Sequence, residues 1–409
     1  MEARTGLVVF VGFLLGCAQN PAPKTEERIF SSATGDCSAQ LHPTQYLAEW
    51  EDGHYSIEHA ASREELLVKF VRPNLKKLKF VEQSQLVALD VQTTSEPTEP
   101  REVWGQTAIG ALELHGQGLR GAGVTIAVID TGVDPKHPQI SGQLHKNAGE
   151  LPGDGIDNDG NGYIDDISGW DFATKNGTLS DPNGHGTHVA GIAAGAAGKF
   201  PTVGVAPSAK ILPLRFMDDK GLGDLSHAVL AIEYAAQQGA QVINASWGGK
   251  QCFKSLDNAI KRVQERGILV VVAAGNDGLA LDKYPKFPAA FENSNQITVG
   301  ASTYRGYTAG FSNTGPLVHL VAPGMEILSA YKVIDGQANW AWRDGTSMAA
   351  PFVSGAIALL KSAHPFATAA EIKNALLATT RKGYCCTLSE GELDAVAAHK
   401  ALSKPIPTP

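Results

Sequence analysis

Three polar residues far apart in the chain, Asp130, His185 and Ser347, lie in short segments whose residue types could carry out nucleophilic catalysis. Asp130 directly follows a continuous apolar run, His185 lies between two glycines, and Ser347 begins a long helix-like segment. A serine hydroxyl becomes an effective nucleophile when a histidine takes its proton and a carboxylate orients that histidine. The order Asp, His, Ser along a chain is one of three unrelated orders in which this geometry occurs.

Each of these residues also has a structural interpretation when it is taken alone. An Asp at the end of a strand is often a turn or cap residue, and a Ser at the start of a helix is often its N-cap. His185 and His188 share one helix face at i, i+3 and could bind a metal ion. Metal-binding pairs more often use i, i+4 spacing with an acidic residue, so the sequence favours catalysis over metal binding.

Two further features suit the negative charge that forms during such a reaction. Backbone N–H groups at the start of the Ser347 helix would point at an anion formed beside the hydroxyl. Asn276 follows the strand-like segment 268–273, and its side-chain amide could be a second donor. Asn-Asp-Gly is also a common turn sequence, so Asn276 could simply be a turn residue. Only the accompanying triad favours its role as an oxyanion donor over that alternative.

The segments 130–132, 185–188 and 345–349 resemble the three signature segments of the subtilisin-like serine proteases, and the resemblance covers roughly residues 103–400. By this resemblance Asp130 orients the base, His185 is general base and then general acid, and Ser347 attacks the scissile carbonyl. Asn276 and the Ser347 backbone N–H would form the oxyanion hole. The implied activity is that of a serine endopeptidase. The alternatives are an inert surface binding module and a peptide ligase that uses the same triad.

Polypeptide substrates of such an enzyme are expected to bind as an extended strand added to exposed backbone edges. Two segments resemble the family's edges, and their residues are Gly221, Leu222, Gly223, Ser246, Trp247 and Gly248. Trp247 departs from the Leu or Tyr usual in the family, and it could narrow the substrate site or pack in the core. Selection among side chains falls to the pocket beneath the first substrate residue.

The elements that must position these groups alternate between strand-like and helix-like segments. The expected strands are 124–129, 210–214, 242–244 and 268–273, and the expected helices are 185–197, 225–238, 255–266 and 347–363. This alternation predicts an α/β fold with a mainly parallel, twisted sheet covered by helices on both faces. Functional groups in such sheets gather at the carboxyl ends of the strands.

An acidic, glycine-rich loop at 154–166 precedes His185 in the chain. Its alternating oxygen ligands match the first half of a calcium-binding EF-hand loop, but the twelfth position is Ser168 instead of Glu. The candidate Ca²⁺ ligands are Asp157, Asp159, Asn161, Asp165 and Asp166. A solvated acidic loop without a cation is the alternative. Subtilases often use structural calcium, although Gln139 stands where many of them have an Asp ligand.

The N-terminus predicts export. Residues 1–16 form a short head and an apolar run that is too short to span a bilayer, and Cys17 follows in a segment that resembles a bacterial lipobox. Lipidation of Cys17 would be the chain's single membrane attachment. A plain secretory signal with an incidental Cys is the alternative. The expected location is the cell envelope or the medium.

The remaining chain divides by composition. We predict a tether at 17–62, a candidate propeptide and hinge at 63–100, the peptidase domain at 101–403 and a tail at 404–409. The short α+β pro-segment has strand-like stretches at 66–71 and 86–91. It resembles a shortened form of the family's inhibitory propeptide, which implies intramolecular inhibition and, as a hypothesis, cleavage near 100–104.

Composition excludes several other classes of protein. The chain has 409 residues, of which 43% are hydrophobic, so it has ample material for a core. Its net charge of −8 and the lack of a Lys/Arg-rich run disfavour nucleic-acid binding. Five cysteines are too few for a disulfide scaffold, but one disulfide from Cys252 to Cys385 or Cys386 is plausible.

Overall fold

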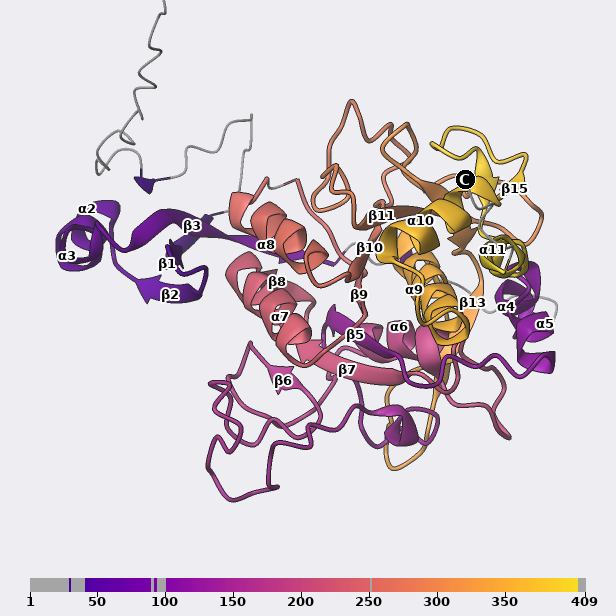
Figure 1. Ribbon diagram of the computed structural model, residues 1–409, viewed down its shortest axis with the longest axis horizontal. Coiled ribbons are helices and arrows are strands. Elements are labelled where there is room, and N and C mark those ends of the chain that lie inside the picture. Colours follow the sequence, from indigo (N-terminus) through magenta and orange to yellow (C-terminus); the bar gives the residue numbers. More distant parts are fainter. Residues whose placement is uncertain (1–28, 31–40, 90–91, 94–100, 251, 404–409) are drawn as a thin grey trace, which may run out of the picture.

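A mainly parallel sheet forms the centre of the molecule. The computed structural model describes residues 29–30, 41–89, 92–93, 101–250 and 252–403. Among these residues, nine strands pair in the order β15-β16-β12-β11-β10-β9-β5-β7-β6 (Figure 1). They are β5 (Thr125–Asp130), β6 (Trp170–Asp171), β7 (Lys210–Arg215), β9 (Val242–Ala245), β10 (Leu269–Ala273), β11 (Gln296–Ser302), β12 (Leu320–Pro323), β15 (Arg381–Lys382) and β16 (Gly391–Glu392). Only β15 and β16 pair antiparallel within it, so the predicted fold class is confirmed.

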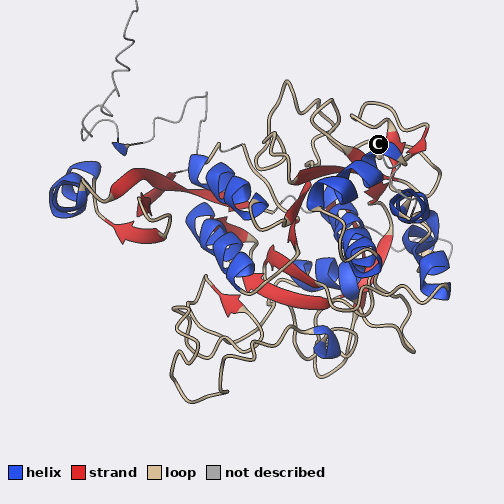
Figure 2. Ribbon diagram, in the orientation of Figure 1, coloured by secondary structure: helices blue, strands red, loops and turns tan. Residues whose placement is uncertain are grey.

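Helices cover both faces of this sheet, as Figure 2 shows. They are α4 (Trp104–Ala108), α5 (Ala111–Gly116), α6 (His185–Ala194), α7 (Leu225–Gln237), α8 (Lys254–Gln264), α9 (Thr346–Ala363), α10 (Ala369–Ala378) and α11 (Ala395–Leu402), with a short 3₁₀ helix, η2 (Ser141–Gln143). The four helices predicted from the sequence are α6 to α9, with small shifts at their ends.

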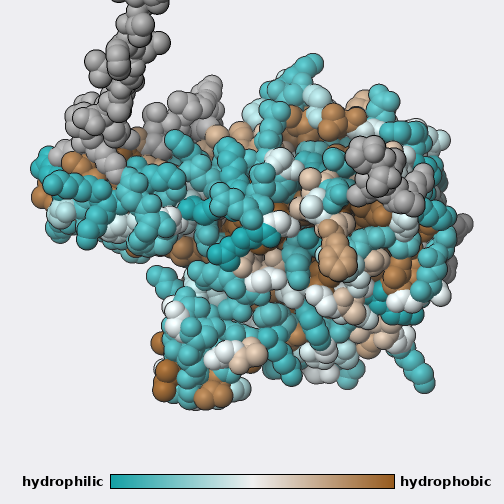
Figure 3. All heavy atoms as spheres, in the orientation of Figure 1, coloured by the Kyte–Doolittle hydropathy of each residue, from teal (hydrophilic) through white to brown (hydrophobic). Residues whose placement is uncertain are grey.

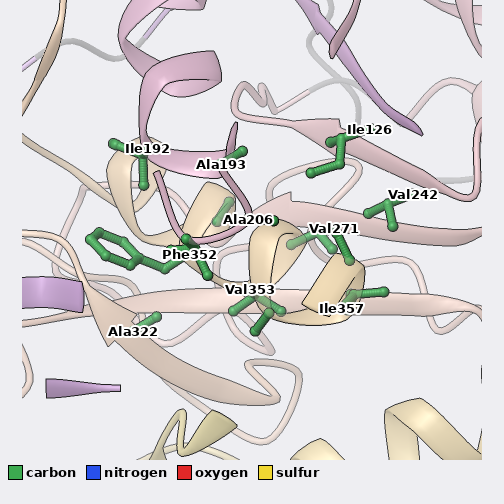
Figure 4. Packing of buried hydrophobic residues seen from close by; sticks show 14 of the residues in the cluster. Ile126, Ile192, Ala193, Ala206, Val242, Val271, Ala322, Phe352, Val353 and Ile357 are labelled. Atoms are coloured by element: carbon green, nitrogen blue, oxygen red, sulfur yellow. The ribbon is translucent and has the colours of Figure 1, made fainter. Parts of the chain in front are cut away.

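Alternation along the buried strands explains the two layers. In β5, Ile126 and Val128 pack in the cluster that contains α6 and α9, whereas Ala127 and Ile129 pack in the cluster that contains α7 and α8. Successive side chains of a strand point to opposite faces, so a strand covered on both sides reads as a continuous apolar run. Figure 4 shows the first of these clusters, with Val353 and Ile357 of α9 packed near strand residues.

An N-terminal module packs beside α7 and α8, as Figure 1 shows in indigo. Its strands β1 (Leu41–Trp50), β2 (Tyr55–His59) and β3 (Leu78–Ala88) form an antiparallel sheet, which β3 extends by pairing with β8 (Leu222–Asp224) of the larger domain. A helical stretch crosses this module as α2 (Arg63–Leu66), the π-helical turn η1 (Leu67–Val71) and α3 (Arg72–Asn74). A third small sheet joins β13 (Ile327–Ala330), β14 (Trp340–Asp344) and β4 (Gln92–Thr93).

The predicted tether at 17–62 is wrong over residues 41–59, which form β1 and β2. The strand β1 is hard to recognise because both of its faces are covered. Tyr46 and Ala48 pack inside the module, whereas Gln45 and Glu49 form hydrogen bonds with side chains of α7 and α8. Polar residues at buried positions therefore conceal the alternation on which a strand prediction depends.

The predicted strand at 66–71 is also wrong, because this stretch is helical. Ser62 accepts a hydrogen bond from the Glu65 backbone N–H at 3.1 Å, and Glu65 accepts one from the Ala61 N–H at 2.7 Å. These bonds start the helix. Leu66 and Val71 are buried together in the module's core, and a short apolar run of this kind does not separate helix from strand.

Several predictions fall outside the described residues. The signal at 1–16, Cys17, Cys37 and the tail at 404–409 belong to this group. Cys385 and Cys386 are free thiols, so the disulfide predicted between one of them and Cys252 is not formed. Within the described residues no helix is long and apolar enough to cross a membrane, and the face in Figure 3 is mostly hydrophilic.

Candidate active site

The carboxyl ends of three neighbouring strands carry candidate catalytic groups. The strands β10, β9 and β5 are adjacent in the sheet. Asp130 is the last residue of β5, Ser246 follows β9, and Asn276 lies just beyond β10. Two helices begin beside them, α6 with His185 and α9 with Thr346. The structure therefore brings together residues that are up to 217 positions apart in the sequence (130 to 347).

Asp130 and His185 are in direct contact. His185 Nδ1 lies 2.7 Å from Asp130 Oδ1, and both side chains are buried. The close approach of α6 to the end of β5 depends on Gly186, because a Cβ there would lie 2.0 Å from the Gly132 carbonyl oxygen. This contact fixes the orientation of the imidazole and favours the tautomer with its proton on Nδ1.

Asp181 joins the segments that carry Asp130 and His185, and the sequence analysis did not identify it. It accepts hydrogen bonds from Thr131 Oγ1 at 2.9 Å, from the Gly184 N–H at 2.7 Å, and from Thr187 N–H and Oγ1 at 2.8 and 2.6 Å. Burial raises the pKa of Asp181 even though these bonds oppose the rise. No local pattern marks Asp181 in the sequence, because its role depends on its contact with Thr131, 50 positions away in the chain.

Ser347 and Asn276 line one small pocket. Asn276 Oδ1 accepts hydrogen bonds from the N–H and the Oγ1 of Thr346, both at 2.9 Å. These two bonds fix the amide oxygen on the start of α9 and so set the orientation of the Asn276 amide group beside the pocket. Ser347 is in the first turn of α9, where backbone N–H groups lack partners within the helix.

The Ser347 hydroxyl is hydrogen-bonded to the end of β9 in this conformation. Its Oγ donates to the Ser246 carbonyl at 2.8 Å, and Ser246 Oγ donates to the Ser347 carbonyl at 2.8 Å. The hydroxyl proton is therefore directed to Ser246 and not to the imidazole of His185. The helices that carry Ser347 and His185, α9 and α6, pack against each other.

The first predicted substrate edge, Gly221 to Gly223, is paired with the N-terminal module. Leu86, Val87 and Ala88 of β3 lie opposite Asp224, Gly223 and Leu222 of β8. The Leu89 N–H continues this ladder with a hydrogen bond to the Gly221 carbonyl at 2.9 Å. Beyond Leu89, Gln92 of β4 pairs with Asp344, three residues before Ser347.

The second predicted edge, Ser246, Trp247 and Gly248, lies beside Ser347. Trp247 is 2% exposed, packs on Phe216, and donates its indole N–H to the Ile129 carbonyl at 2.8 Å. Trp247 and Gly248 also line the pocket that contains Ser347 and Asn276. Trp247 therefore packs in the core and also lines this pocket.

The acidic loop gathers part of the predicted calcium ligand set. Carboxylate oxygens of Glu150, Asp159 and Asp166 lie within 4.8 Å of one another, and Asn161 Nδ2 donates to Asp166 at 2.9 Å. Glu150 was not predicted, because it precedes the alternating acidic run.

The structure does not bring the other two predicted carboxylates, Asp157 and Asp165, into that group. They accept backbone N–H groups of the loop instead, Asp157 from Asn161 and Gly162, and Asp165 from Gly153 and Gly155. They stabilise turns, which is a role that a pattern of acidic residues does not distinguish from metal binding.

His188 does not form a metal pair with His185. Its Nε2 lies 2.8 Å from the Ala341 carbonyl oxygen, whereas His185 contacts Asp130. Burial, with the nearby Arg343, lowers the pKa of His188 to about 3, so this imidazole is neutral at physiological pH. Among the described residues, the cluster around Glu150 is the one group suited to a metal ion.

Comparison with known proteins agrees with this geometry. The Subtilase family model matches residues 121–397, which is more than half of the chain. The chain belongs to the subtilase family. This subtilase is 33% identical to Subtilisin Savinase of Lederbergia lenta over 296 residues, 72% of this chain and 97% of that protein. It is 36% identical to Thermitase of Thermoactinomyces vulgaris over 243 residues, 59% of this chain and 76% of that protein.

A solved structure extends the likeness to the N-terminal part of this subtilase. Fervidolysin from Fervidobacterium pennivorans, described as a keratinolytic enzyme related to subtilisin, matches with a TM-score of 0.74 at 25% identity. The match covers 93% of this chain and 63% of that one, so the chain spans less than two thirds of fervidolysin. This subtilase is a serine endopeptidase with the subtilisin-like fold.

Proposed function

We propose that this subtilase cleaves peptide bonds through an acyl-enzyme on Ser347, with His185 as general acid and base and Asp130 as the orienting carboxylate. The 2.7 Å contact between His185 Nδ1 and Asp130 Oδ1 carries this proposal. Ser347 Oγ attacks the scissile carbonyl and His185 Nε2 takes the hydroxyl proton. His185 then gives that proton to the leaving amine as the C–N bond breaks. Water hydrolyses the ester by the same steps in reverse.

The reaction requires the Ser347 hydroxyl to leave the Ser246 carbonyl, to which it donates at 2.8 Å. A rotation about χ1 redirects it, and such rotations between staggered wells are fast for a small side chain. Catalytic hydrogen bonds are often absent or long before substrate binds and form in the substrate complex. The bond to Ser246 therefore holds the hydroxyl in a resting position.

The Asn276 amide and the Ser347 backbone N–H stabilise the oxyanion in this mechanism. The oxygen of Asn276 is fixed by Thr346 N–H and Oγ1 at 2.9 Å, so its amide nitrogen is already oriented. One such donor contributes about 3–4 kcal/mol to transition-state stabilisation, a magnitude established on subtilisin itself.

Substrates bind as a strand on the edges Gly221–Gly223 and Ser246–Gly248, and the N-terminal module blocks the first of these edges. The pairing of β3 with β8 supports intramolecular inhibition by this module. Leu89 pairs with Gly221, and Gln92 pairs with Asp344, three residues before Ser347, which favours maturation at a bond between Leu89 and Gln92 over the earlier hypothesis of 100–104.

The loop cluster of Glu150, Asp159 and Asp166 would hold a structural Ca²⁺ ion. Three carboxylate groups within 4.8 Å of one another fit a hard divalent cation, and without one they would repel. The ion would tie the loop to α7, because Asp166 also accepts the Tyr234 hydroxyl at 2.6 Å. A melting temperature that does not change on calcium chelation would contradict this site.

The enzyme is exported, and the precursor is anchored by a lipid on Cys17. The sequence of residues 1–17 supports this part of the proposal.

The decisive experiment compares the matured protein with its Ser347→Ala variant. We expect casein hydrolysis and labelling by a fluorophosphonate in the first and neither in the second. Labelling with peptide ligation but no hydrolysis would favour the acyl-transfer alternative. Neither labelling nor hydrolysis in correctly matured protein would favour an inert binding module.

A further inference from the structure

The pocket beside Ser347 contains a positive charge that the mechanism does not use. Ser347 and Asn276 line this pocket together with Trp247, Gly248, Gly275 and Lys286. Lys286 is the one charged side chain among the described residues that line it. A charged group beside the nucleophile and the oxyanion donor is in the position to choose the substrate side chain next to the scissile bond.

Lys286 is held in the pocket by its neighbours. Its side chain is 13% exposed, and Nζ lies 2.6 Å from Asp277 Oδ2. Its Cδ would lie 2.9 Å from a Cβ at position 275, so the methylene chain passes where only glycine leaves room. Gly275 also has φ +97°, a conformation that favours glycine.

Asp277 does not cancel the positive character of this region. Burial raises the pKa of Asp277, but its hydrogen bond and charge interaction with Lys286, together with the charge of Lys250, lower the pKa by more. Asp277 is therefore ionised, and one carboxylate lies beside two ammonium groups. Lys250 and Lys286 flank the backbone pair Gly249–Phe287, which bonds at 2.9 and 2.7 Å. An ammonium has three N–H donors, so Lys286 can bind a second carboxylate while it keeps Asp277.

The pairing of the N-terminal module points to the same chemistry. The Leu89 N–H bonds to the Gly221 carbonyl of a predicted substrate edge, and Gln92 pairs with Asp344, three residues before Ser347. The two residues between them in the sequence are Asp90 and Val91, which lie outside the described residues. Cleavage between Asp90 and Val91, one of the three bonds between Leu89 and Gln92, would place an acidic residue of the chain's own propeptide on the amino side of the scissile bond.

We propose that Lys286 gives this protease a preference for Asp or Glu on the amino side of the scissile bond. This inference rests on the proposed endopeptidase function. The competing interpretation is that Lys286 serves only to pair with Asp277, in which case the narrow pocket would accept small neutral residues and show no preference for charge.

The test measures kcat/KM of the matured enzyme on internally quenched peptides that differ only in that residue, as Asp/Asn and Glu/Gln pairs. We expect kcat/KM to be about tenfold higher for the acidic peptide of each pair. This ratio lies between the effects of exposed ion pairs and of buried ion pairs on binding. Lys286→Met should abolish the preference, so that the acidic and neutral members of each pair are cleaved with equal kcat/KM. Asp277→Asn should increase the preference, and added salt should decrease it.

A matched control and the labelling reaction keep the outcomes separate. Lys283→Met removes an exposed charge three residues away and should leave every ratio unchanged. Fluorophosphonate labelling of Lys286→Met reports that its active site is intact. Equal cleavage of acidic and neutral peptides by the wild type, or an unchanged ratio in Lys286→Met, would overturn the specificity proposal alone. Failure of the wild type to cleave any peptide or to take the label would instead overturn the endopeptidase function.

Discussion

At the scale of single residues, the site depends on a carboxylate that never touches the reacting atoms. Asp181 accepts four hydrogen bonds, from Thr131 next to Asp130 and from Gly184 and Thr187 around His185. It is therefore a positioning residue, since it fixes the distance between the two segments that carry the base and its carboxylate.

We predict that Asp181→Ala destabilises the fold by about 3 kcal/mol, because it leaves several buried donors without an acceptor. It should also lower kcat about tenfold with little change in KM, because the His185 segment loses its support while the substrate edges remain. Urea unfolding in the Ser347→Ala background and steady-state kinetics in the active enzyme measure the two effects.

Asp181→Asn separates positioning from a general loss of stability. The Asn oxygen can still accept from Thr131 and Gly184, but its NH₂ group cannot accept from Thr187. Its kcat should therefore lie between those of the wild type and Asp181→Ala. Equal kcat values for all three proteins at a temperature where each is folded would exclude the positioning role.

At the scale of elements, the N-terminal module acts on the helix starts of the larger domain. Glu82 of β3 accepts the backbone N–H groups of Lys254 and Ser255 at 3.1 and 2.9 Å, where α8 begins. A carboxylate at this position satisfies two donors that have no partner in the helix and interacts favourably with the helix dipole.

We predict that Glu82→Gln weakens the hold of the module on the enzyme about tenfold, because the amide has one acceptor oxygen and no charge. The lag between self-cleavage and full activity in progress curves of the purified precursor should shorten. Glu64→Gln, which changes an exposed acidic residue of α2, is the matched control. A lag that is the same in Glu82→Gln and the wild type would contradict this role.

Elements that are buried on both faces by apolar residues could be predicted from the sequence, as β5 and α9 show. The residue types of the proposed triad and their short flanking patterns could also be recognised in the sequence, because they do not depend on the rest of the fold. In contrast, β1 was missed because polar residues, Gln45 and Glu49, occupy buried positions on one of its faces. There they form hydrogen bonds with side chains of α7 and α8 across the interface between the module and the larger domain. Asp181, Glu82 and Lys286 act through contacts with distant segments, and no local pattern records such contacts.

At the scale of the whole molecule, buried neutral histidines make stability depend on pH. Burial lowers the pKa of His188 to about 3, against about 6.5 in an unfolded chain. Between these values the unfolded chain binds a proton at this residue and the folded protein does not. This stabilising contribution is therefore complete above pH 6.5 and is lost as the pH falls toward 3.

We predict that His188 alone costs the protein about 2 kcal/mol of unfolding free energy between pH 6.5 and pH 5. Urea unfolding of the Ser347→Ala protein at several pH values measures the slope. His188→Gln, which can still donate to the Ala341 carbonyl, should have a slope smaller by about 1.4 kcal/mol per pH unit. The exposed His59→Gln should retain the original slope, and an equal slope for all three would refute the prediction.

The arrangement of the chain also sets where the active enzyme resides. The proposed lipid on Cys17 would lie on the amino side of the module, and the proposed cleavage between Leu89 and Gln92 would lie on the carboxyl side of β3. Dissociation of the module would then remove the block on β8 and the anchor in one event.

We predict that Ser347→Ala precursor partitions into the detergent phase of a phase-separating detergent, whereas the fluorophosphonate-labelled wild-type enzyme partitions into the aqueous phase. Labelled enzyme that keeps an N-terminal epitope and stays with the detergent would mean that maturation leaves the protease on its anchor.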